Sequence, residues 1–362
     1  MGLTKVLAAS AVRGAHVLVV EVPGSWPLRA LMERAVLERG WRLAAAAADA
    51  DVLAVCGHPG PQCAEAVETV WDQLPGPRVR IEVETEAETI SALDRAAREL
   101  SDTPTHQQDA RQRSVSPVVT TAHAQMDMSM DMPMDMDMDM DMEMAPEGIP
   151  LAAGGDDRDG LEMDVLHLRL GPLLRYWPAG LVLRCTLHGD VISGAQTEVI
   201  DVVTQAASPV LRSAWLCDNI TTVVALTGWE DAAAQARRVR DSLVTGQDLD
   251  RAAAALDSLA RRIRRSRLLR WSLRDIGVLT VDEARQLHLS SDQAGDAWDR
   301  LLIMLEHAGG EPSAGKGVSA VPVNAVAAVP GLVEGLDLAA ARLIVASLGL
   351  APFAARDMDA HG

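Results

Sequence analysis

The sequence predicts an α/β domain, a long polar segment and a mainly helical α+β domain, in that order along the chain. Three observations predict this division. Short β-branched runs alternate with amphipathic runs over residues 1–100. Sequence rich in Met, Asp, Ser and Thr replaces this pattern over residues 101–160. Residues 161–362 begin with strand-like runs and then continue with apolar residues at helical spacing.

The first domain is predicted to be a parallel, flavodoxin-like sheet. Its strands are HVLVVEV (16–22), ADVLAVCG (50–57) and RVRIEVE (78–84), each a short run of the kind that is buried in parallel sheets. Helices are predicted between and after them, over 26–41, 61–74 and 86–100. Strands that alternate with helices at this spacing imply right-handed crossovers and a parallel order.

Ligands of such sheets bind beyond the carboxyl ends of the strands. Cys56, His58 and Cys63 cluster at the end of the second predicted strand, which makes them a candidate site. The alternative interpretation is that both thiols are small buried hydrophobic groups. Neither the end of this strand nor the end of the first predicted strand carries a glycine-rich phosphate-binding motif. No fourth metal ligand accompanies the three residues.

Residues 101–160 are predicted to form a disordered, Met- and Asp-rich linker. Within it, MDMSMDMPMDMDMDMDMEM places a methionine at every even position of 126–144 and an acidic residue at seven of the nine positions between. Three roles remain open: an acidic tether, a metal-binding segment, or a segment that docks on an arginine-rich helix. Alternation is typical of a strand, but Asp and Pro133 disfavour one.

Thioether ligands favour a soft metal such as Cu(I), with Ni(II) as a further candidate, whereas carboxylates favour hard cations. The candidate metal ligands are the thioethers of this segment and a nearby imidazole: Met126, Met128, Met130, Met132, Met134, Met136, Met138, Met140, Met142, Met144 and His123.

The second domain, over residues 161–362, is predicted to start with strands at 162–172 and 180–200, the latter folded into a hairpin at His188-Gly-Asp. Helices are predicted after Pro209, over 228–246, 248–275, 291–307 and 334–348. Thr280 and Glu283 have the spacing of a capping box, which indicates the start of a short helix.

Arginines crowd the end of the helix predicted over 248–275. They are candidates for docking on an acidic partner, on anionic lipid headgroups or on nucleic acid, or they form a solvated helix face favoured by the helix dipole. The candidate docking residues are Arg261, Arg262, Arg264, Arg265, Arg267 and Arg270.

Composition narrows the function classes. The net charge of −18 argues against a nucleic-acid-binding protein, because neutralisation of phosphates dominates such affinity. The four cysteines form no Cys-x-x-Cys pair, which is typical of reduced thiols in a cytosolic protein. Only Lys5 and Lys316 are lysines among 33 basic residues, a bias typical of a high-GC bacterial genome. No signal peptide or membrane span is predicted, so the chain is expected to be cytoplasmic or peripheral on the cytoplasmic face of the inner membrane.

Three stretches of the second domain resemble the D-type, hydrogenase large-subunit-like quinone-site subunit of respiratory complex I. They are LGPLLRYWPAGLVLRCTLHGDVI (170–192), IGVLTVDEARQLHLSS (276–291) and GDAWDRLLIMLEH (295–307), in the order of that family. Residues 50–79, ADVLAVCGHPGPQCAEAVETVWDQLPGPRV, are similar to part of the B-type partner subunit. The resemblance covers about half of the chain.

The resemblance implies four cysteine ligands of an iron–sulfur cluster, including a Cys-Cys pair, and for hydrogenases two Cys-x-x-Cys motifs that hold nickel and iron. None of these motifs is present. Leu173, Leu174 and Arg175 follow Gly171-Pro172, where the D-type pattern has a histidine. No catalytic or cofactor-binding residue of the family therefore carries over to this chain.

The sequence supports three hypotheses of function. The first is a redox-silent subunit or accessory protein of a complex I-like or membrane-bound hydrogenase-like assembly, whose other subunits are its partners and which binds no cofactor. The second is a metal-handling protein that uses the segment 126–144. The third is an active subunit of the NADH–quinone oxidoreductase type, which a likeness of fold suggests but does not establish.

Overall fold

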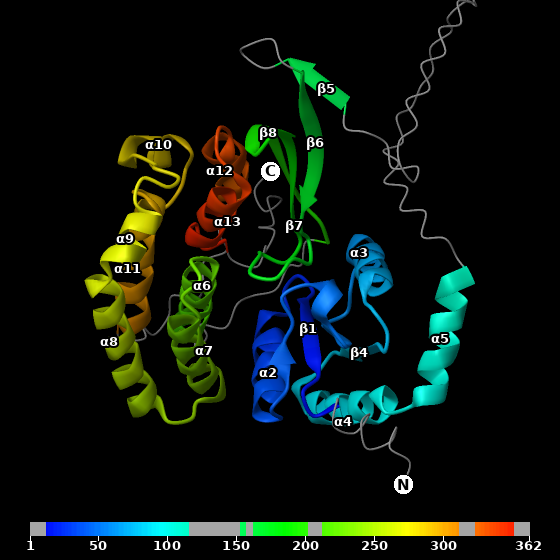
Figure 1. Ribbon diagram of the computed structural model, residues 1–362. Helices are drawn as coiled ribbons and strands as arrows, with labels where there is room; N and C mark the ends of the chain where they lie inside the picture. The colour runs from blue at the N-terminus through cyan, green and yellow to red at the C-terminus, as the bar shows by residue number, and fades with distance from the viewer. Residues whose placement is uncertain (1–11, 116–152, 157–161, 202–211, 311–322, 351–362) are drawn as a thin grey trace, which may run out of the picture.

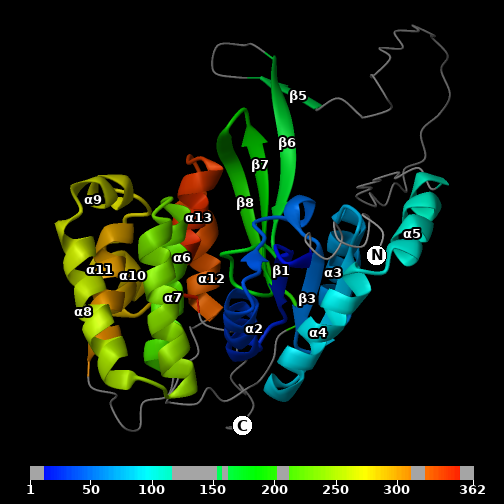
Figure 2. The same cartoon turned by 60° about the horizontal axis from the view of Figure 1, so that its bottom comes forward.

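The computed structural model describes residues 12–115, 153–156, 162–201, 212–310 and 323–350. Figure 1 shows a parallel sheet with its helices, an antiparallel sheet, and a group of helices on the other side of that sheet. Helix α2 lies between the parallel sheet and helix α7 in both Figure 1 and Figure 2. The two parts predicted from the sequence therefore pack against each other.

The N-terminal part is a four-stranded parallel sheet with the order β2-β1-β3-β4. Its strands are β1 (His16–Glu21), β2 (Arg42–Leu43), β3 (Val52–Cys56) and β4 (Val79–Val83). Three predicted strands and their parallel pairing are confirmed, and the two-residue strand β2 is an addition at the edge.

Helices cover both faces of this sheet. Helices α2 (Trp26–Glu38) and α4 (Thr89–Leu100) pack on one face, where Met32 and Leu93 meet Val17 and Ile81. Helix α3 (Pro61–Gln73) packs on the other face. Because successive strand residues point to opposite faces, β1 supplies both cores, which explains its continuous apolar run.

The second sheet is antiparallel, with the order β5-β6-β7-β8. The predicted hairpin at His188-Gly-Asp is confirmed, since β7 and β8 pair on either side of Gly189, which has a positive φ. The strands are β5 (Ala153–Asp156), β6 (Glu162–Leu170), β7 (Leu181–His188) and β8 (Val191–Val199).

Helices fill the rest of the C-terminal part. One core lies among the α6, α7, α8, α9 and α11 helices, and a second lies between the antiparallel sheet and the last two helices. These helices are α6 (Arg212–Leu226), α7 (Glu230–Thr245), α8 (Leu249–Arg265), α9 (Arg267–Leu273), α10 (Val281–Gln286), α11 (Ala297–Gly309), α12 (Val323–Val333) and α13 (Leu338–Ser347).

The predicted linker over 101–160 is wrong at both ends. Helix α5 (Thr103–Val115) continues the N-terminal part, and β5 pairs with β6 inside the range assigned to the linker. Helix α5 has no apolar face in its sequence, and polar contacts tie it to the connection between α3 and β4: Arg78 Nη2 donates to Asp109 at 3.3 Å, and Arg113 donates to the carbonyl of Leu74 at 3.3 Å. Residues 116–152 lie outside the described residues.

Three helices predicted in the C-terminal part have different bounds. The helix predicted over 248–275 breaks at Ser266, whose hydroxyl caps α9 by accepting from the Leu269 amide at 3.2 Å. The helix predicted over 291–307 starts at Ala297, because Asp296 caps it. The helix predicted over 334–348 starts at Leu338, after Gly335 at φ +82° and the cap Asp337.

No helix among the described residues is long and apolar enough to cross a bilayer.

Candidate functional site

The most distinctive surface is the junction between the two parts, where β1 and α2 face α6, α7 and the loop 171–180. We call this loop the junction loop. Gly180 allows the close approach, since it has φ +80° and a Cβ there would lie 2.8 Å from Cγ of Pro23. Arg175 extends across the junction and donates to the carbonyls of Leu43 and Ala44 at 3.2 and 3.0 Å. The backbone of each part therefore contacts the other directly.

The junction loop also joins the hydrophobic cores. Leu173 packs against the core under α3, Leu174 against the core of the antiparallel sheet, and Tyr176 against the core among the helices. Trp177 fixes the loop on its own sheet by donating from Nε1 to the carbonyl of Leu181 at 2.8 Å. Three side chains of this ten-residue loop thus contact three different cores, and the relative position of these cores depends on the loop.

Charged side chains are buried in the middle of the junction. Arg29 of α2 binds three carboxylates: Nε donates to Glu21 at 2.5 Å, Nη1 donates to Glu33 at 2.8 Å, and Nη2 donates to Asp218 of α6. The contact with Asp218 joins residues of the two parts that are 189 positions apart in sequence. Its guanidinium therefore links β1, α2 and α6.

Arg240 of α7 binds two of the same carboxylates as Arg29, from the other side of the junction. Its side chain has no exposed area, and its Nη1 donates to Glu33 and to Asp218, each at 2.7 Å. Nε and Nη2 of Arg240 bind its neighbour Asp241 at 2.9 and 2.7 Å. Glu33 and Asp218 consequently each bind both arginines, one from each part.

The pKa values follow from this arrangement. Burial alone would raise the pKa of Glu33, but Arg29, Arg240 and Arg237 hold it well below the ordinary value. Burial raises the pKa of Glu21 above its ordinary value, and its bonds to Arg29 oppose this only in part. Burial would lower the pKa of Arg240, but the carboxylates around it raise it.

The network contains one more acid than base. Because a buried charge without a partner is costly, a proton binds most readily to an acid whose pKa is raised by burial. Those acids are Glu21, at the end of β1, and Asp241, beside Arg240. The acids are Glu21, Glu33, Asp218 and Asp241, and the bases are Arg29, Arg237 and Arg240.

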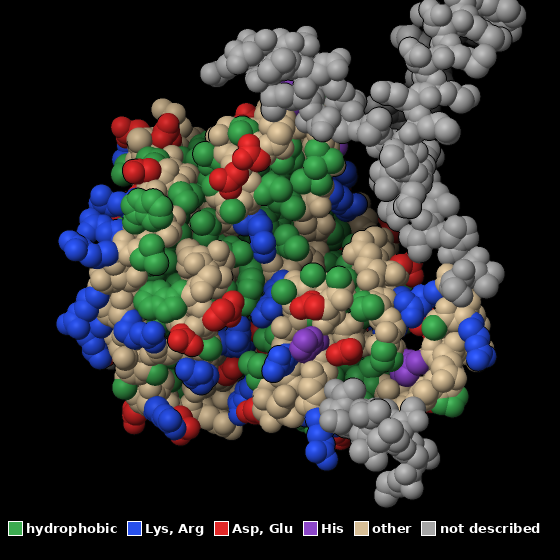
Figure 3. Space-filling view, viewed as in Figure 1, with side chains coloured by type: hydrophobic (Ala, Val, Ile, Leu, Met, Phe, Trp, Pro, Cys, Tyr) green, Lys and Arg blue, Asp and Glu red, His purple; other side chains and the backbone are tan. Residues whose placement is uncertain are grey.

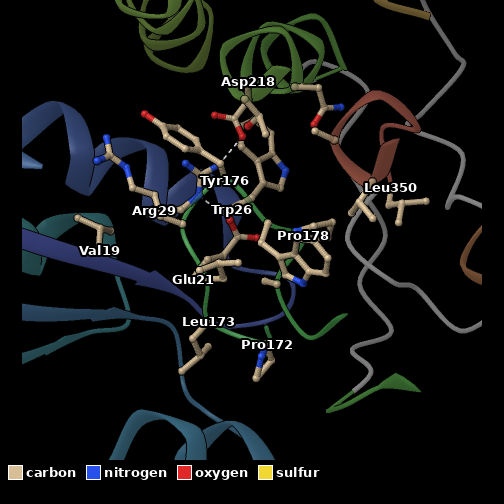
Figure 4. Close-up of a pocket in the computed structure, with 18 of the residues that line it drawn as sticks. Val19, Glu21, Trp26, Arg29, Pro172, Leu173, Tyr176, Pro178, Asp218 and Leu350 are labelled. Carbon is tan, nitrogen blue, oxygen red and sulfur yellow. Dashed lines mark hydrogen bonds and ion pairs between the residues drawn. The ribbon is translucent and has the colours of Figure 1, made fainter. Parts of the chain in front are cut away.

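A cavity of about 90 Å³ adjoins the network (Figure 4). Trp26, Tyr176, Trp177 and Trp215 line it, four of the ten aromatic residues of the chain. The labelled side chains of Arg29, Glu21 and Asp218 supply its polar side. The volume accommodates a few water molecules and is below the roughly 300–1,000 Å³ typical of pockets for organic ligands.

The sequence-predicted cluster at the end of β3 does not form a metal site. Cys56 is buried, and burial raises the pKa of its thiol far above the ordinary range. The His58 side chain is 85% exposed, with Nδ1 at 3.4 Å from Glu84. Cys63 is buried at the start of α3, where its amide donates to Asp201 at 2.6 Å, and burial raises the pKa of its thiol to about 11.

The cysteines do not fit an iron–sulfur or nickel site. Cys56, Cys185 and Cys217 lie in three different hydrophobic clusters, and burial raises the pKa of each thiol. Metal ligation needs thiolates that converge on one point. Across the described ranges, no three His, Cys, Asp or Glu side chains are grouped as metal ligands. The candidate ligands His123 and Met126–Met144 lie outside those ranges.

The arginines proposed for docking are exposed at the end of α8 and on α9. Within the part of the chain that the structure describes, Arg262 alone among them bonds to another element, since it donates to Gln235 at 2.7 Å and lies over the ring of Trp229. Leu268, two residues after the break at Ser266, is 72% exposed.

Sequence reasoning missed the buried ion network altogether. Charged residues on helices are usually solvated, so the sequence of α2 does not indicate that Arg29 and Glu33 are buried. A signal was present in α7, where Arg237 and Arg240 are spaced four and seven residues from the small apolar Ala233 and thus belong to its buried face. Alanines beside an arginine at that spacing leave room for a buried guanidinium.

No protein-family model matches the chain, and no curated protein is significantly similar to it.

Proposed function

We propose that the chain is a redox-silent subunit or accessory protein of a complex I-like or membrane-bound hydrogenase-like assembly, and that it acts through protein–protein contacts. One observation carries the proposal. The part that resembles a B-type subunit packs directly on the part that resembles a D-type subunit, through the buried ions of Arg29, Asp218 and Arg240. In the resemblance these two subunit types are partners, and here one chain holds both.

The strand order β2-β1-β3-β4 supports a flavodoxin-like N-terminal domain, with helices on both faces and strand ends that point to the junction. The antiparallel hairpin followed by helices supports a D-type-like second domain. In this proposal, the boundary between the two domains falls within residues 116–152.

Two observations favour a binding role over the electron-transferring alternative. The thiols that the family uses as ligands have no counterparts in sequence, and the cysteines present are packed singly in hydrophobic clusters. The cavity at the junction is about 90 Å³, too small for a quinone ring with its substituents, whereas its ion pairs hold the two parts in one orientation. A rigid junction suits a protein that presents fixed surfaces to partners.

The test is affinity purification of the tagged full chain from native membranes, with assays for iron, nickel, acid-labile sulfide and co-purifying subunits. Subunits of one oxidoreductase assembly in fixed ratio, with no metal bound to this chain, are the expected result. A monomer without partners, or a chain loaded with iron and sulfide, would contradict the proposal.

A matched pair of variants links this test to the junction. Arg240→Met removes a buried partner of Glu33, and it should reduce co-purification because the two parts lose their fixed orientation. Arg238→Met changes an exposed arginine two residues away on the same helix, and it should leave co-purification unchanged.

Metal handling by residues 126–144 is the second candidate. The ten alternating methionines favour it, since several thioethers from one short segment can bind a soft cation together. Calorimetry of the peptide 120–146 with Cu(I), Ni(II) and Ca(II) tests it. Binding of Cu(I) tighter than about 1 mM supports this function, and the absence of binding with all three metals sinks it.

A further inference from the structure

Helix α9 exposes two large apolar side chains on one face. Leu268 is 72% exposed and Trp271 is 78% exposed, and their i, i+3 spacing places them side by side. The opposite face anchors the helix, because Leu269 and Leu273 are buried in the core among the helices. Both exposed side chains therefore project from a fixed support.

Unpaired positive charge surrounds this apolar pair. The arginines around it, at positions 261, 264, 265, 267, 270 and 274, make no ion pair with any other residue that the structure describes, in contrast to the arginines of the junction. Figure 3 shows basic side chains along the edge of the molecule over α8 and α9, with hydrophobic side chains beside them. We call the pair and its surrounding arginines the arginine–tryptophan face: Arg261, Arg264, Arg265, Arg267, Leu268, Arg270, Trp271 and Arg274.

We propose that the arginine–tryptophan face binds the surface of an anionic phospholipid bilayer, with Leu268 and Trp271 inserted among the headgroups. Arginine forms charge-assisted hydrogen bonds with phosphate, and tryptophan partitions to the interface between headgroups and acyl chains. A basic helical face with Trp and Leu on it is the pattern of proteins that lie on membranes. The chain has a net charge of −18, so a cluster of six arginines is a local positive region on an acidic protein.

The shape and place of the face favour a membrane over a protein partner. Side chains that stand out by more than two thirds of their area enter a fluid interface without a matching groove, whereas a protein partner must supply one. The acidic segment 126–144 is a second conceivable occupant. It is attached beyond α5, which lies at the edge of the molecule opposite α8 and α9 in both Figure 1 and Figure 2.

A bilayer approaches the exposed side chains of α9 from outside the molecule, so it is the occupant that this placement favours. This inference does not depend on the proposed function, since the isolated chain would bind lipid as well.

The test is co-sedimentation of the full chain with vesicles of phosphatidylcholine containing about one third phosphatidylglycerol, and with pure phosphatidylcholine vesicles. The chain should bind the anionic vesicles only, and binding should weaken between about 0.1 and 0.5 M salt. The triple variant R264Q/R267Q/R270Q should bind about 100-fold more weakly, near five-fold per arginine. The double variant L268S/W271S should bind at least about ten-fold more weakly.

Matched controls use exposed residues elsewhere. R42Q/R98Q/R251Q removes the same charge, and Ile90→Ser removes a side chain that is 59% exposed on α4; both should bind anionic vesicles within about two-fold of the unchanged protein. Equal losses in the controls, or no binding by the full chain, overturn the proposal. If deletion of 126–144 is needed before vesicles bind, the acidic segment is the occupant and the proposal is likewise overturned.

Discussion

At the scale of single residues, Glu33 is the most consequential side chain of the junction. It binds Arg29 at 2.8 Å and Arg240 at 2.7 Å while its side chain is only 13% exposed. Its removal leaves two buried guanidinium groups with fewer partners. This loss lowers the free energy of unfolding far more than the loss of a solvent-exposed ion pair does. Glu33 therefore shares with Asp218 the role of holding both buried arginines in place.

Replacing Glu33 with Gln should lower the free energy of unfolding by about 3 kcal/mol, because two arginines lose a charged partner in a buried site. The matched control is Glu38→Gln on the same helix, whose carboxylate is 60% exposed and pairs with Arg34. This control should change stability by less than about 0.5 kcal/mol. Urea unfolding of both variants measures the difference, and equal effects would show that the network contributes nothing special.

The pH dependence of stability should also report on Glu33. Since its folded pKa lies below the ordinary value of 4.5, Glu33 stabilises the fold above that pH and loses this contribution as the pH falls further. Glu21 acts in the opposite sense, because its raised pKa makes the charged form costly at neutral pH, and protonation relieves that cost.

Urea midpoints between about pH 7 and pH 3 test this assignment. The unchanged protein should lose stability below about pH 4.5, and Glu33→Gln should lose less over the same interval. Parallel curves for the two proteins would mean that other carboxylates govern the acid transition.

At the scale of elements, α3 is held across the junction by Asp201. The carboxylate of Asp201 accepts from the Cys63 amide at 2.6 Å and closes the N-terminus of a helix that belongs to the other part. Gly60 makes room for it, since a Cβ there would lie 2.4 Å from the carboxyl carbon. A residue from beyond the hairpin thus caps a helix of the parallel-sheet part.

Asp201→Ala should cost about 1 kcal/mol in the free energy of unfolding, because an orphan amide loses its acceptor and the helix dipole loses a negative charge. Asp201→Asn keeps an acceptor and should recover part of this loss. Asp257→Ala, an exposed change on α8, serves as the control with an effect below about 0.5 kcal/mol. Thermal unfolding ranks the three, and an unaffected Asp201→Ala would show that water replaces the cap at no cost.

The element scale also shows what the sequence could and could not predict. β1, β3 and β4 were predictable because their apolar runs depend on local composition, and the capping box at Thr280 was predictable because its donors and acceptors lie within three residues. Helix α5 was not predictable, because its partners Arg78 and Leu74 lie between α3 and β4, more than 30 residues away in sequence. The break at Ser266 was hidden by apolar spacing that continues through it.

The candidate site was predictable only where local patterns determine it. The exposed arginines of α8 and α9 follow from their run, whereas the network depends on Arg29 and Asp218 meeting across 189 positions. Cys56 and His58 are neighbours in sequence, yet one side chain is buried and the other faces solvent. Proximity along a strand end therefore did not make a site.

At the scale of the whole molecule, the junction should make the two parts unfold together. Calorimetry of the full chain should give one cooperative transition, because separating the parts exposes buried ion pairs and the core contacts of the junction loop. Arg240→Met should lower stability by about 3–5 kcal/mol and resolve two transitions, whereas Arg238→Met should keep one. Two transitions in the unchanged protein would contradict this coupling.

The single chain has a consequence for how the junction forms. Buried ion pairs define orientation well but add little net affinity, so two separate polypeptides that met through Arg29, Asp218 and Arg240 would dissociate on dilution. Joined by one backbone, the two surfaces meet at an effective concentration that is independent of how much protein the cell makes. The ratio of the two parts is then fixed at one to one by translation itself, and neither is present without the other.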